Sequence, residues 1–350
     1  MRNGLLKIIA LSTLVGVAGL TAIDCGKGIT PLGPQSTNNN NNKSLSKSTV
    51  KSNLPLPPYA IWTPTGDILY CDDRYFRIID EAGTELSKIR VLGDDEKDKT
   101  AVFPSWAGSD IVYQVNTPRG SEIRAQNAFG GIAKTLDFGL PEGIYEYPAI
   151  SPDKKFIAFT FNTMPQISSY PPKGKATPVN PDDLGGLDSW NRWAGMYSWS
   201  SDDRLALAIK TEGTNIYVME NIQLKADNTI DVNSIRLRKI TSGNYSDNYP
   251  SWSPDCSHIT FDSTRGAIDR NLFIVNSDGT DLKNLSKEMS NVNNNSLVSK
   301  TDSVNKNAIT TGIGHFYARF NPNPYNGNKI VHSSNRLFDF GIGLVENPIQ

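Results

Sequence analysis

The hydrophobic positions of the chain fall into three zones with different patterns. Residues 8–20 form a mostly apolar run that follows Arg2 and Lys7. Residues 26–58 hold few hydrophobic side chains and consist mainly of Asn, Ser, Lys, Pro and Gly. From Tyr59 onward, short stretches alternate apolar and polar residues between turn-forming residues, which is typical of β-strands. The pattern predicts a leader, a tether and an all-β body.

The body is built from a repeat whose clearest copy lies between residues 249 and 285. In chain order, this copy reads Tyr249-Pro250-Ser251-Trp252-Ser253-Pro254-Asp255, Ile259-Thr260-Phe261, Asn271-Leu272-Phe273-Ile274-Val275, Ser277-Asp278-Gly279 and Leu282 to Leu285. The Ser-Pro-Asp and Asp-Gly segments favour tight turns, because Pro presets φ, Asp bonds its own backbone and Gly accepts positive φ. Each copy therefore predicts four short strands.

The start of the repeat occurs six times, each time around one bulky apolar residue that we name the anchor. The anchors are Trp62, Trp106, Ile150, Trp199, Trp252 and Phe320, at intervals of 44 to 68 residues. One four-stranded sheet about every 40 to 45 residues is the period of a propeller blade, and loops absorb the longer intervals. We therefore expect an all-β fold over residues 59–350, a six-bladed β-propeller of four-stranded antiparallel blades with the anchors in its core.

The sixth blade lacks a strand at its end. Only residues 329–333 and 338–345 follow its anchor as strand-like segments. A ring with an incomplete blade exposes unpaired strand edges. We therefore expect residues 48–54, from the N-terminal side, to complete the blade.

The motif resembles the repeat of a known family. The run Pro250-x-Trp252-Ser253-Pro254-Asp255, followed by Ile259-x-Phe261, Arg265 and Asp278-Gly279, is similar to the WD40-like repeat of the TolB periplasmic propeller family. The resemblance covers residues 59–350. It implies a protein-binding platform at the cell envelope, with no cofactor and no catalytic residues. TolB itself carries an α/β domain where this chain has a tether, so membership of a Tol-type complex is not implied.

The leader ends in Thr21-Ala22-Ile23-Asp24-Cys25. An apolar core of about 13 residues suits an export signal and is too short to cross a bilayer comfortably. A lone cysteine directly after such a core resembles the acylated cysteine of bacterial lipoproteins, although Asp24 stands where that family carries Gly, Ala or Ser. An ordinary secreted protein is the alternative, but no small-x-small cleavage site precedes Cys25.

The resemblance to lipoproteins divides the N-terminal region into two parts. We expect residues 1–24 to be a lipoprotein signal peptide and residues 25–58 to be a lipidated tether that begins at Cys25. By the rule of that family, Gly26 after the cysteine favours the outer membrane. The protein is then expected to contact the membrane through its lipid anchor.

The charge balance excludes one class of partner. The chain has 35 Lys and Arg residues against 36 Asp and Glu residues. A dedicated nucleic-acid binder would show an excess of basic residues. We therefore expect no nucleic acid among the partners.

Few residues point to catalysis. The chain has no Gly-x-Ser-x-Gly segment, which a nucleophile elbow needs. Its histidines, His258, His315 and His332, do not occupy corresponding positions of the repeat. Propellers of the oligogalacturonate lyase type gather several histidines around a metal at one mouth of the channel. Because the three histidines of this chain are scattered instead, we expect no metal site. A carbohydrate-active enzyme of that type and a small-ligand sensor remain as alternatives.

The two cysteines of the body fall in different blades. Cys71 belongs to the first blade and Cys256 to the fifth, and these blades are not neighbours in a ring of six. The Cα atoms of a disulfide lie within about 7 Å of each other. We therefore expect no bond between the two residues and a free thiol at each.

The segment of residues 162–195 departs most from the repeat. It contains five prolines and keeps the large aromatic residues Tyr170, Trp190 and Trp193. Exposed Tyr and Trp are favoured contacts in protein interfaces. One hypothesis is that these three residues bind a partner; the alternative is that Trp190 and Trp193 pack the missing layer of the third blade. The Asn-rich residues 287–314 predict a polar loop without a role.

Together these patterns predict a lipid-anchored envelope propeller that acts as a protein-binding scaffold or adhesin. Its partner is expected to be another envelope or extracellular macromolecule, a protein rather than a small substrate.

Overall fold

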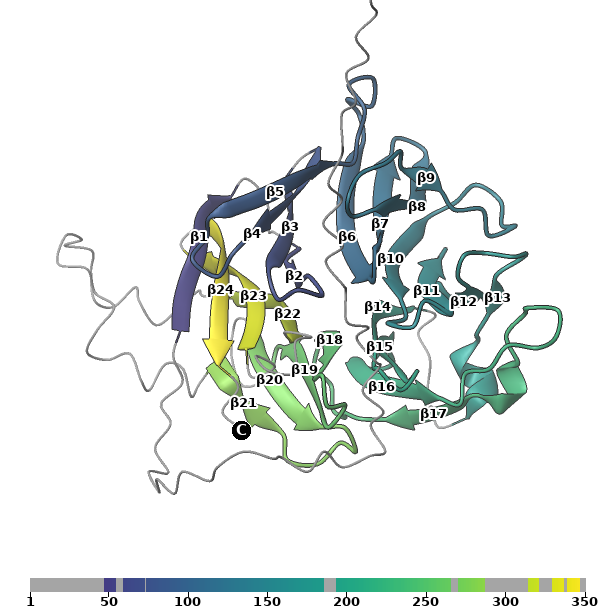
Figure 1. Ribbon diagram of the computed structural model, residues 1–350. Helices are drawn as coiled ribbons and strands as arrows, with labels where there is room; N and C mark the ends of the chain where they lie inside the picture. Colours follow the sequence, from purple (N-terminus) through teal and green to yellow (C-terminus); the bar gives the residue numbers. More distant parts are fainter. Residues whose placement is uncertain are drawn as a thin grey trace, which may run out of the picture.

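The computed structural model describes residues 47–54, 59–72, 74–185, 193–265, 270–286, 314–320, 329–336 and 339–346. Their strands form six four-stranded antiparallel sheets, which lie around a common centre (Figure 1). The expected all-β propeller of four-stranded antiparallel blades is confirmed.

The blades follow one another along the chain. The first two contain β2 (Ile61–Trp62), β3 (Ile68–Asp72), β4 (Tyr75–Ile79), β5 (Glu85–Arg90), β6 (Thr100–Ala107), β7 (Asp110–Thr117), β8 (Gly120–Asn127) and β9 (Lys134–Thr135). The next two contain β10 (Tyr145–Ile150), β11 (Phe156–Phe161), β12 (Met164–Ser169), β13 (Thr177–Pro178), β14 (Ala194–Trp199), β15 (Leu205–Lys210), β16 (Thr214–Glu220) and β17 (Arg236–Lys239). The fifth contains β18 (Asp247–Trp252), β19 (His258–Ser263), β20 (Asn271–Asn276) and β21 (Lys283–Asn284). Two short 3-10 helices, η1 (Pro181–Leu184) and η2 (Val232–Ser234), lie in loops.

The remaining sheet joins the two ends of the chain. It contains β22 (Gly314–Phe320), β23 (Lys329–Arg336), β24 (Asp339–Glu346) and, as its outer strand, β1 (Lys47–Leu54). β1 is antiparallel to β24, with Lys47 opposite Val345 and Leu54 opposite Phe340, and the two strands lie side by side in Figure 1. The expected closing strand is confirmed, so part of the segment assigned to the tether belongs to the propeller.

The anchors pack between neighbouring blades. Trp62, Trp199, Trp252 and Phe320 are between 5% and 8% exposed. The indole N–H of Trp199 donates to the Ala149 carbonyl of the preceding blade at 3.0 Å, and that of Trp62 donates to the Arg319 carbonyl of the closing blade at 3.0 Å. The expected core role of these anchors is confirmed. Trp106 differs, because it is only half-buried.

The turn after the anchor has a repeated construction. Ser151 Oγ donates to Asp153 at 2.7 Å, and Ser253 Oγ donates to Asp255 at 2.5 Å. The residue four positions after the anchor has a positive φ in four copies, where it is Gly66, Lys154, Asp203 and Cys256. The expected Ser-x-Asp turn is thus present, and it holds non-glycine residues in a conformation that favours glycine.

The prolines of the segment of residues 162–195 do not interrupt the strands of the third blade. The proline-containing β12 and β13 form regular outer strands of the third blade, with Pro165 opposite Thr160 and Pro178 opposite Gln166. Among the described residues, no helix is long and apolar enough to cross a membrane.

Candidate functional site

The innermost strand of five blades carries a β-bulge near its middle. The register breaks between Val102 and Ser105 in β6, and equivalent breaks occur in β10, β14, β18 and β22. Four described residues within these breaks have φ values between 50° and 60°: Phe103, Tyr147, Met196 and Tyr249. Positive φ is unfavourable for bulky side chains and recurs at functional sites. The same strained conformation is therefore built into at least four blades.

The bulges bring aromatic rings together. A regular inner strand directs its side chains toward the two neighbouring blades, whereas a bulge re-aims one of them. The ring of Phe103 lies 4.2 Å from Tyr59, 4.6 Å from Tyr147 and 6.4 Å from Tyr249, measured between centroids. Phe103 and Tyr249 belong to the second and fifth blades, which are opposite in the ring. These four residues, the aromatic collar, therefore meet across the centre of the propeller.

The collar has a sequence signal that the repeat analysis missed. A bulky residue stands three positions before every anchor, and these residues are Tyr59, Phe103, Tyr147, Met196, Tyr249 and Tyr317. The alternation of strand residues would assign this position to inter-blade packing. The bulge changes its direction, and no alternation of apolar and polar residues reports a bulge.

Polar groups hold the bulges in place. Gln114 Oε1 accepts a hydrogen bond from the Tyr147 backbone N–H at 3.1 Å. Arg319 Nη1 donates to the carbonyls of Tyr249 and Pro250 at 3.3 and 3.2 Å. These bonds satisfy backbone groups that the bulges remove from the strand ladder.

The fifth blade also buries a carboxyl group. Asp262 is 0% exposed and accepts a hydrogen bond from Arg270 Nη1 at 2.9 Å, while its Oδ1 has no hydrogen-bond partner. Burial raises the pKa of Asp262 to about 7, and Arg270 opposes that rise. Among the residues that the structure describes, no three His, Cys, Asp or Glu side chains are grouped so that they could hold a metal ion.

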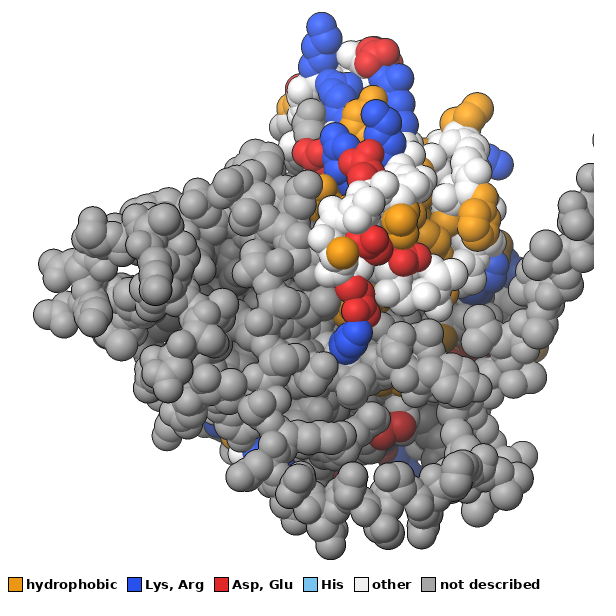
Figure 2. Space-filling view, turned by 60° about the vertical axis from the view of Figure 1, so that its left-hand side comes forward, with side chains coloured by type: hydrophobic (Ala, Val, Ile, Leu, Met, Phe, Trp, Pro, Cys, Tyr) orange, Lys and Arg blue, Asp and Glu red, His pale blue; other side chains and the backbone are white. Residues whose placement is uncertain are grey.

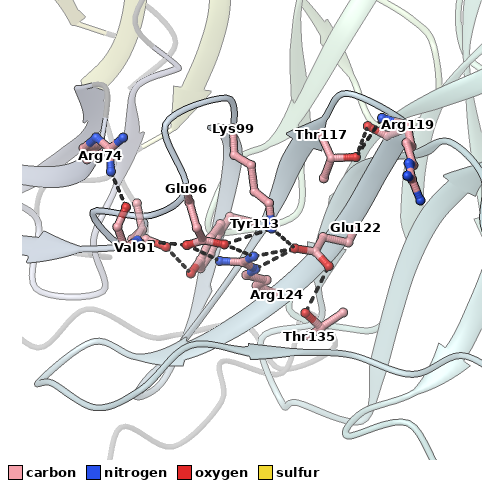
Figure 3. A network of polar contacts seen from close by, with 12 residues as sticks. Arg74, Val91, Glu96, Lys99, Tyr113, Thr117, Arg119, Glu122, Arg124 and Thr135 are labelled. Carbon is pink, nitrogen blue, oxygen red and sulfur yellow. Dashed lines mark hydrogen bonds and ion pairs between the residues drawn. The ribbon is translucent and has the colours of Figure 1, made fainter.

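A charged network ties the connection between the first two blades to the second blade (Figure 3). Arg124 lies between Glu96 and Glu122 and donates to each at 2.5 Å, and Lys99 donates to Glu96 at 2.9 Å. These ion pairs and hydrogen bonds hold the pKa of Glu96 well below its usual range. Tyr113, whose hydroxyl donates to the Val91 carbonyl, packs beneath the network. All four charges are paired within the network, which indicates a structural role.

A groove lies between the first and second blades. Its volume is about 650 Å³, and its walls include β5 on one side and Trp106 and Phe129 on the other. The indole N–H of Trp106 donates to Gly108 of its own blade at 2.8 Å, so it forms no hydrogen bond to the preceding blade as that of Trp199 does, although the ring packs against the cluster shared by the first two blades. The incomplete packing of Trp106 leaves the groove open.

Exposed apolar side chains border this groove. Phe129 is 85% exposed and Leu86 is 53% exposed, and Ile132, in the same turn as Phe129, is 89% exposed. Figure 2 shows hydrophobic side chains on a described face of the molecule, beside a group of Lys, Arg, Asp and Glu side chains. Clustered exposed apolar residues mark interaction sites more often than single ones do.

The residues expected to bind a partner do not form one described surface. Tyr170 packs against the cluster between the second and third blades, and its hydroxyl donates to Asp110 at 3.3 Å. Trp193 is half-buried, packs against a different cluster and lies 6.2 Å from the Tyr147 ring. Trp190 and Cys25 lie outside the described residues. Trp193 packs against a cluster of the fourth and fifth blades rather than within the third, and partner binding by this segment stays a prediction.

The histidines and cysteines are placed as follows. His258 is half-buried with its Nδ1 2.6 Å from Ser257 Oγ. His315 and His332 lie in β22 and β23, opposite Ser334 and Gly343. Cys71 is free, which confirms the expected absence of a bond to Cys256. The expectation of a free thiol at Cys256 is wrong, because this residue is disulfide-bonded.

Comparisons with known proteins give matches among solved structures alone. No family model matches the chain, and no curated protein sequence matches it. A putative TolB from Agrobacterium tumefaciens is similar in structure, with 16% identity and a TM-score of 0.48 over 64% of this chain and 78% of that one. TolB from Acinetobacter baumannii has 19% identity and a TM-score of 0.46 over 65% of this chain and 53% of that one.

A third similar structure comes from outside the TolB proteins. A chain of a nidogen/laminin complex has 10% identity and a TM-score of 0.50 over 77% of this chain and 87% of that one. At these identities, structural similarity establishes fold and not activity. What the chain shares with the nidogen/laminin chain is its fold.

Proposed function

We propose that the protein is a lipid-anchored propeller of the bacterial cell envelope that binds another protein and catalyses no reaction. One observation carries the binding role: exposed apolar side chains border the groove between the first two blades. Phe129, at 85% exposure, is the largest of them. A fold with a packed core does not need such residues at its rim.

The groove has the form that protein interfaces favour. Aromatic and aliphatic side chains at the centre of an interface contribute most of its binding energy when a partner excludes water from them. Phe129 and Leu86 stand at the borders of a cavity of about 650 Å³ whose wall contains Trp106. A partner side chain inserted there would contact all three.

The location follows from the N-terminal sequence. The apolar run before Cys25 suits export, and the cysteine that follows it is the residue that a bacterial lipoprotein acylates. Four lysines and no acidic residue occupy residues 26–58. Basic side chains close to anionic lipid head groups add about 1 kcal/mol each to membrane attraction. The composition of the tether therefore supports the proposed position at a membrane, and Gly26 supports the outer membrane.

Cys25→Ser tests the anchor. The variant should lose labelling by a fatty-acid probe and move from the membrane to the soluble fraction. The chain has three cysteines, of which Cys71 is free and Cys256 is disulfide-bonded. An acylated Cys25 cannot also form a disulfide, so the proposal requires that Cys256 is reduced or bonded to another molecule in the anchored protein. A mass spectrum that shows Cys25 linked to Cys256 would refute this part of the proposal.

The binding role is tested by cross-linking in intact envelopes. A variant with Phe129→Ser and Leu86→Ser should capture at least about tenfold less of the main cross-linked partner, equivalent to about 1.4 kcal/mol. Ile144→Ser is the matched control, because Ile144 is 51% exposed but does not line the groove. Equal capture by the wild type, the double variant and the Ile144→Ser control would contradict the role of the groove in binding. Release of unsaturated sugars from oligogalacturonate by the purified protein would contradict a non-catalytic role.

A further inference from the structure

The groove between the first two blades runs along an outer strand edge that no other described strand covers. β5 is the outermost strand of its blade and pairs only with β4 among the described strands. It has six residues, whereas the outer strands β9, β13 and β21 have two each. Proteins keep outer strands short because a long free edge can pair with another chain. β5 is thus longer than four of the described outer strands, β9, β13, β17 and β21, and shorter than β1.

The register shows which backbone groups of β5 point into the groove. Ile89 lies opposite Phe76, and the next inward-facing residue, Val91, donates its N–H to the Arg74 carbonyl at 2.9 Å. Since inward and outward groups alternate along an antiparallel strand, the N–H and C=O groups of Lys88 and Arg90 point away from β4. Gln126 Nε2 confirms this direction, because it donates to the Arg90 carbonyl from the second blade at 3.1 Å.

The opposite wall of the groove can receive side chains. Trp106 and Phe129 line it, together with Ala128 and two glycines of the turn between β8 and β9. A strand laid along β5 would direct alternate side chains to this apolar wall and the others to solvent. Backbone hydrogen bonds would supply affinity, and the wall would supply selectivity.

Charge favours an acidic segment at this edge. Lys88 and Arg90 lie on β5, and Arg90 is already paired with Asp94. The Lys88 ammonium lies 5.1 Å from the centre of the Tyr75 ring and forms no ion pair with a described residue. The chain's own tether carries lysines and no acidic residue between residues 26 and 58. Like charges would thus oppose the tether as the occupant of this edge.

We propose that an extended segment of the protein partner adds to β5 as a fifth strand of the first blade. Its alternate apolar side chains contact Trp106 and Phe129, and an acidic side chain lies next to Lys88. This proposal rests on the binding role proposed above and specifies its mode.

The test uses a substitution that removes one outward-facing hydrogen. Lys88→Pro deletes the outward N–H and leaves the ladder to β4 intact, and proline is tolerated on edge strands. Lys88→Ala is the matched control, because it removes the same charge and keeps the N–H. The probes are fluorescent seven-residue peptides that alternate Val with Glu or Thr, a version with Lys in place of Glu, and a version with Pro at alternate positions. Fluorescence anisotropy reports binding, and the melting temperature reports folding.

The expected result separates strand addition from contact by side chains alone. Lys88→Pro should bind the acidic peptide at least about tenfold more weakly than Lys88→Ala, with equal melting temperatures. The Lys peptide should bind more weakly than the acidic one, and the Pro version should not bind. In the wild type, the acidic peptide should slow hydrogen exchange at the Lys88 and Arg90 amides, which face the groove, and leave Ile89 unchanged.

Equal binding by the Pro and Ala variants, or unchanged exchange at Lys88, would overturn strand addition. If Lys88→Pro does not fold, the exchange measurement on the wild type decides alone. If no peptide binds but partner capture still depends on Phe129, strand addition is rejected and the binding role of the groove is retained. If partner capture does not depend on Phe129 either, both strand addition and the binding role are rejected.

Discussion

Trp199 and Trp252 occupy equivalent anchor positions and differ in the surroundings of one atom. Both side chains are buried, at 8% and 6% exposure. The indole N–H of Trp199 donates to the Ala149 carbonyl, whereas Nε1 of Trp252 is buried without a hydrogen-bond partner. Replacing each tryptophan with phenylalanine removes the same atoms from both sites. The two variants therefore isolate the effect of the hydrogen bond.

The structure gives the sign and size of the difference. Trp199→Phe removes one hydrogen bond to the Ala149 carbonyl, which lies opposite Ala158 in the strand ladder, and the loss of one such bond costs about 0.5–1.5 kcal/mol. Trp252→Phe removes a donor that was already unsatisfied, so it carries no such cost. The Arg204 guanidinium, 4.5 Å from the centre of the Trp252 ring, keeps an aromatic face in the variant. The loss of ring volume is common to both, so we expect Trp199→Phe to be less stable than Trp252→Phe by about 1 kcal/mol.

Urea unfolding followed by circular dichroism measures this difference, since tryptophan fluorescence itself changes between the variants. The unfolding slopes should agree, which shows that the midpoints reflect stability. Trp252→Ala provides the scale and should cost about 3–5 kcal/mol, because it also empties the site. Equal stabilities for the two phenylalanine variants would refute the role assigned to the indole hydrogen bond. A cost below about 1 kcal/mol for Trp252→Ala would contradict its role as a core anchor.

Three further predictions concern other parts of the molecule. Glu96 has a pKa below its usual value of about 4.3, so its stabilising effect is present above that pH and is lost as pH falls toward the folded-state pKa. Glu96→Gln should therefore lower the melting temperature at about pH 7. The melting temperature of this variant should also fall less than that of the wild type between about pH 5 and pH 3. Asp203 has a φ of 63°, which strains a non-glycine backbone, and a carboxyl pKa that burial raises. Asp203→Gly should therefore stabilise the protein by about 1 kcal/mol in urea unfolding. A loss of stability would contradict the backbone strain at this residue. Tyr170→Ser should lower the melting temperature more than Tyr170→Phe, because the serine loses the ring packing and the phenylalanine loses only the bond to Asp110; equal values would contradict the packing of the ring.

The sequence predicts the blades well because their period depends on short-range chemistry. Ser253, Pro254 and Asp255 form their turn through local hydrogen bonds and a fixed φ, so the turn is visible in the residues themselves. The closing strand was also predictable, since an incomplete blade requires a partner for β24. The prolines of β12 and β13 made these two strands hard to predict from the sequence, but both strands are present and contain them.

The groove and the aromatic collar could not be predicted in the same way. Trp106 carries the anchor motif, yet its indole bonds within its own blade, and only the placement of β5 determines this. The direction of Phe103 depends on a bulge, which is a property of two paired strands rather than of one segment. Tyr170 and Trp193 are large aromatic residues in a proline-rich segment. These two properties do not distinguish a contact with a partner from a contact with the next blade.

The strand that closes the ring is also the part of the propeller nearest to the proposed lipid. Only 21 residues separate Cys25 from Lys47, where β1 begins. The tether expected from the sequence would, at that length, average about 25 Å from end to end. When a bound partner is pulled away from the membrane, the mechanical load enters the propeller at the pairing of β1 with β24. Detachment of β1 would release eight residues, or about 27 Å of extra chain, and would open the ring at the same moment. In the anchored state, the reach of the protein and the integrity of its fold are therefore limited by the same row of backbone hydrogen bonds.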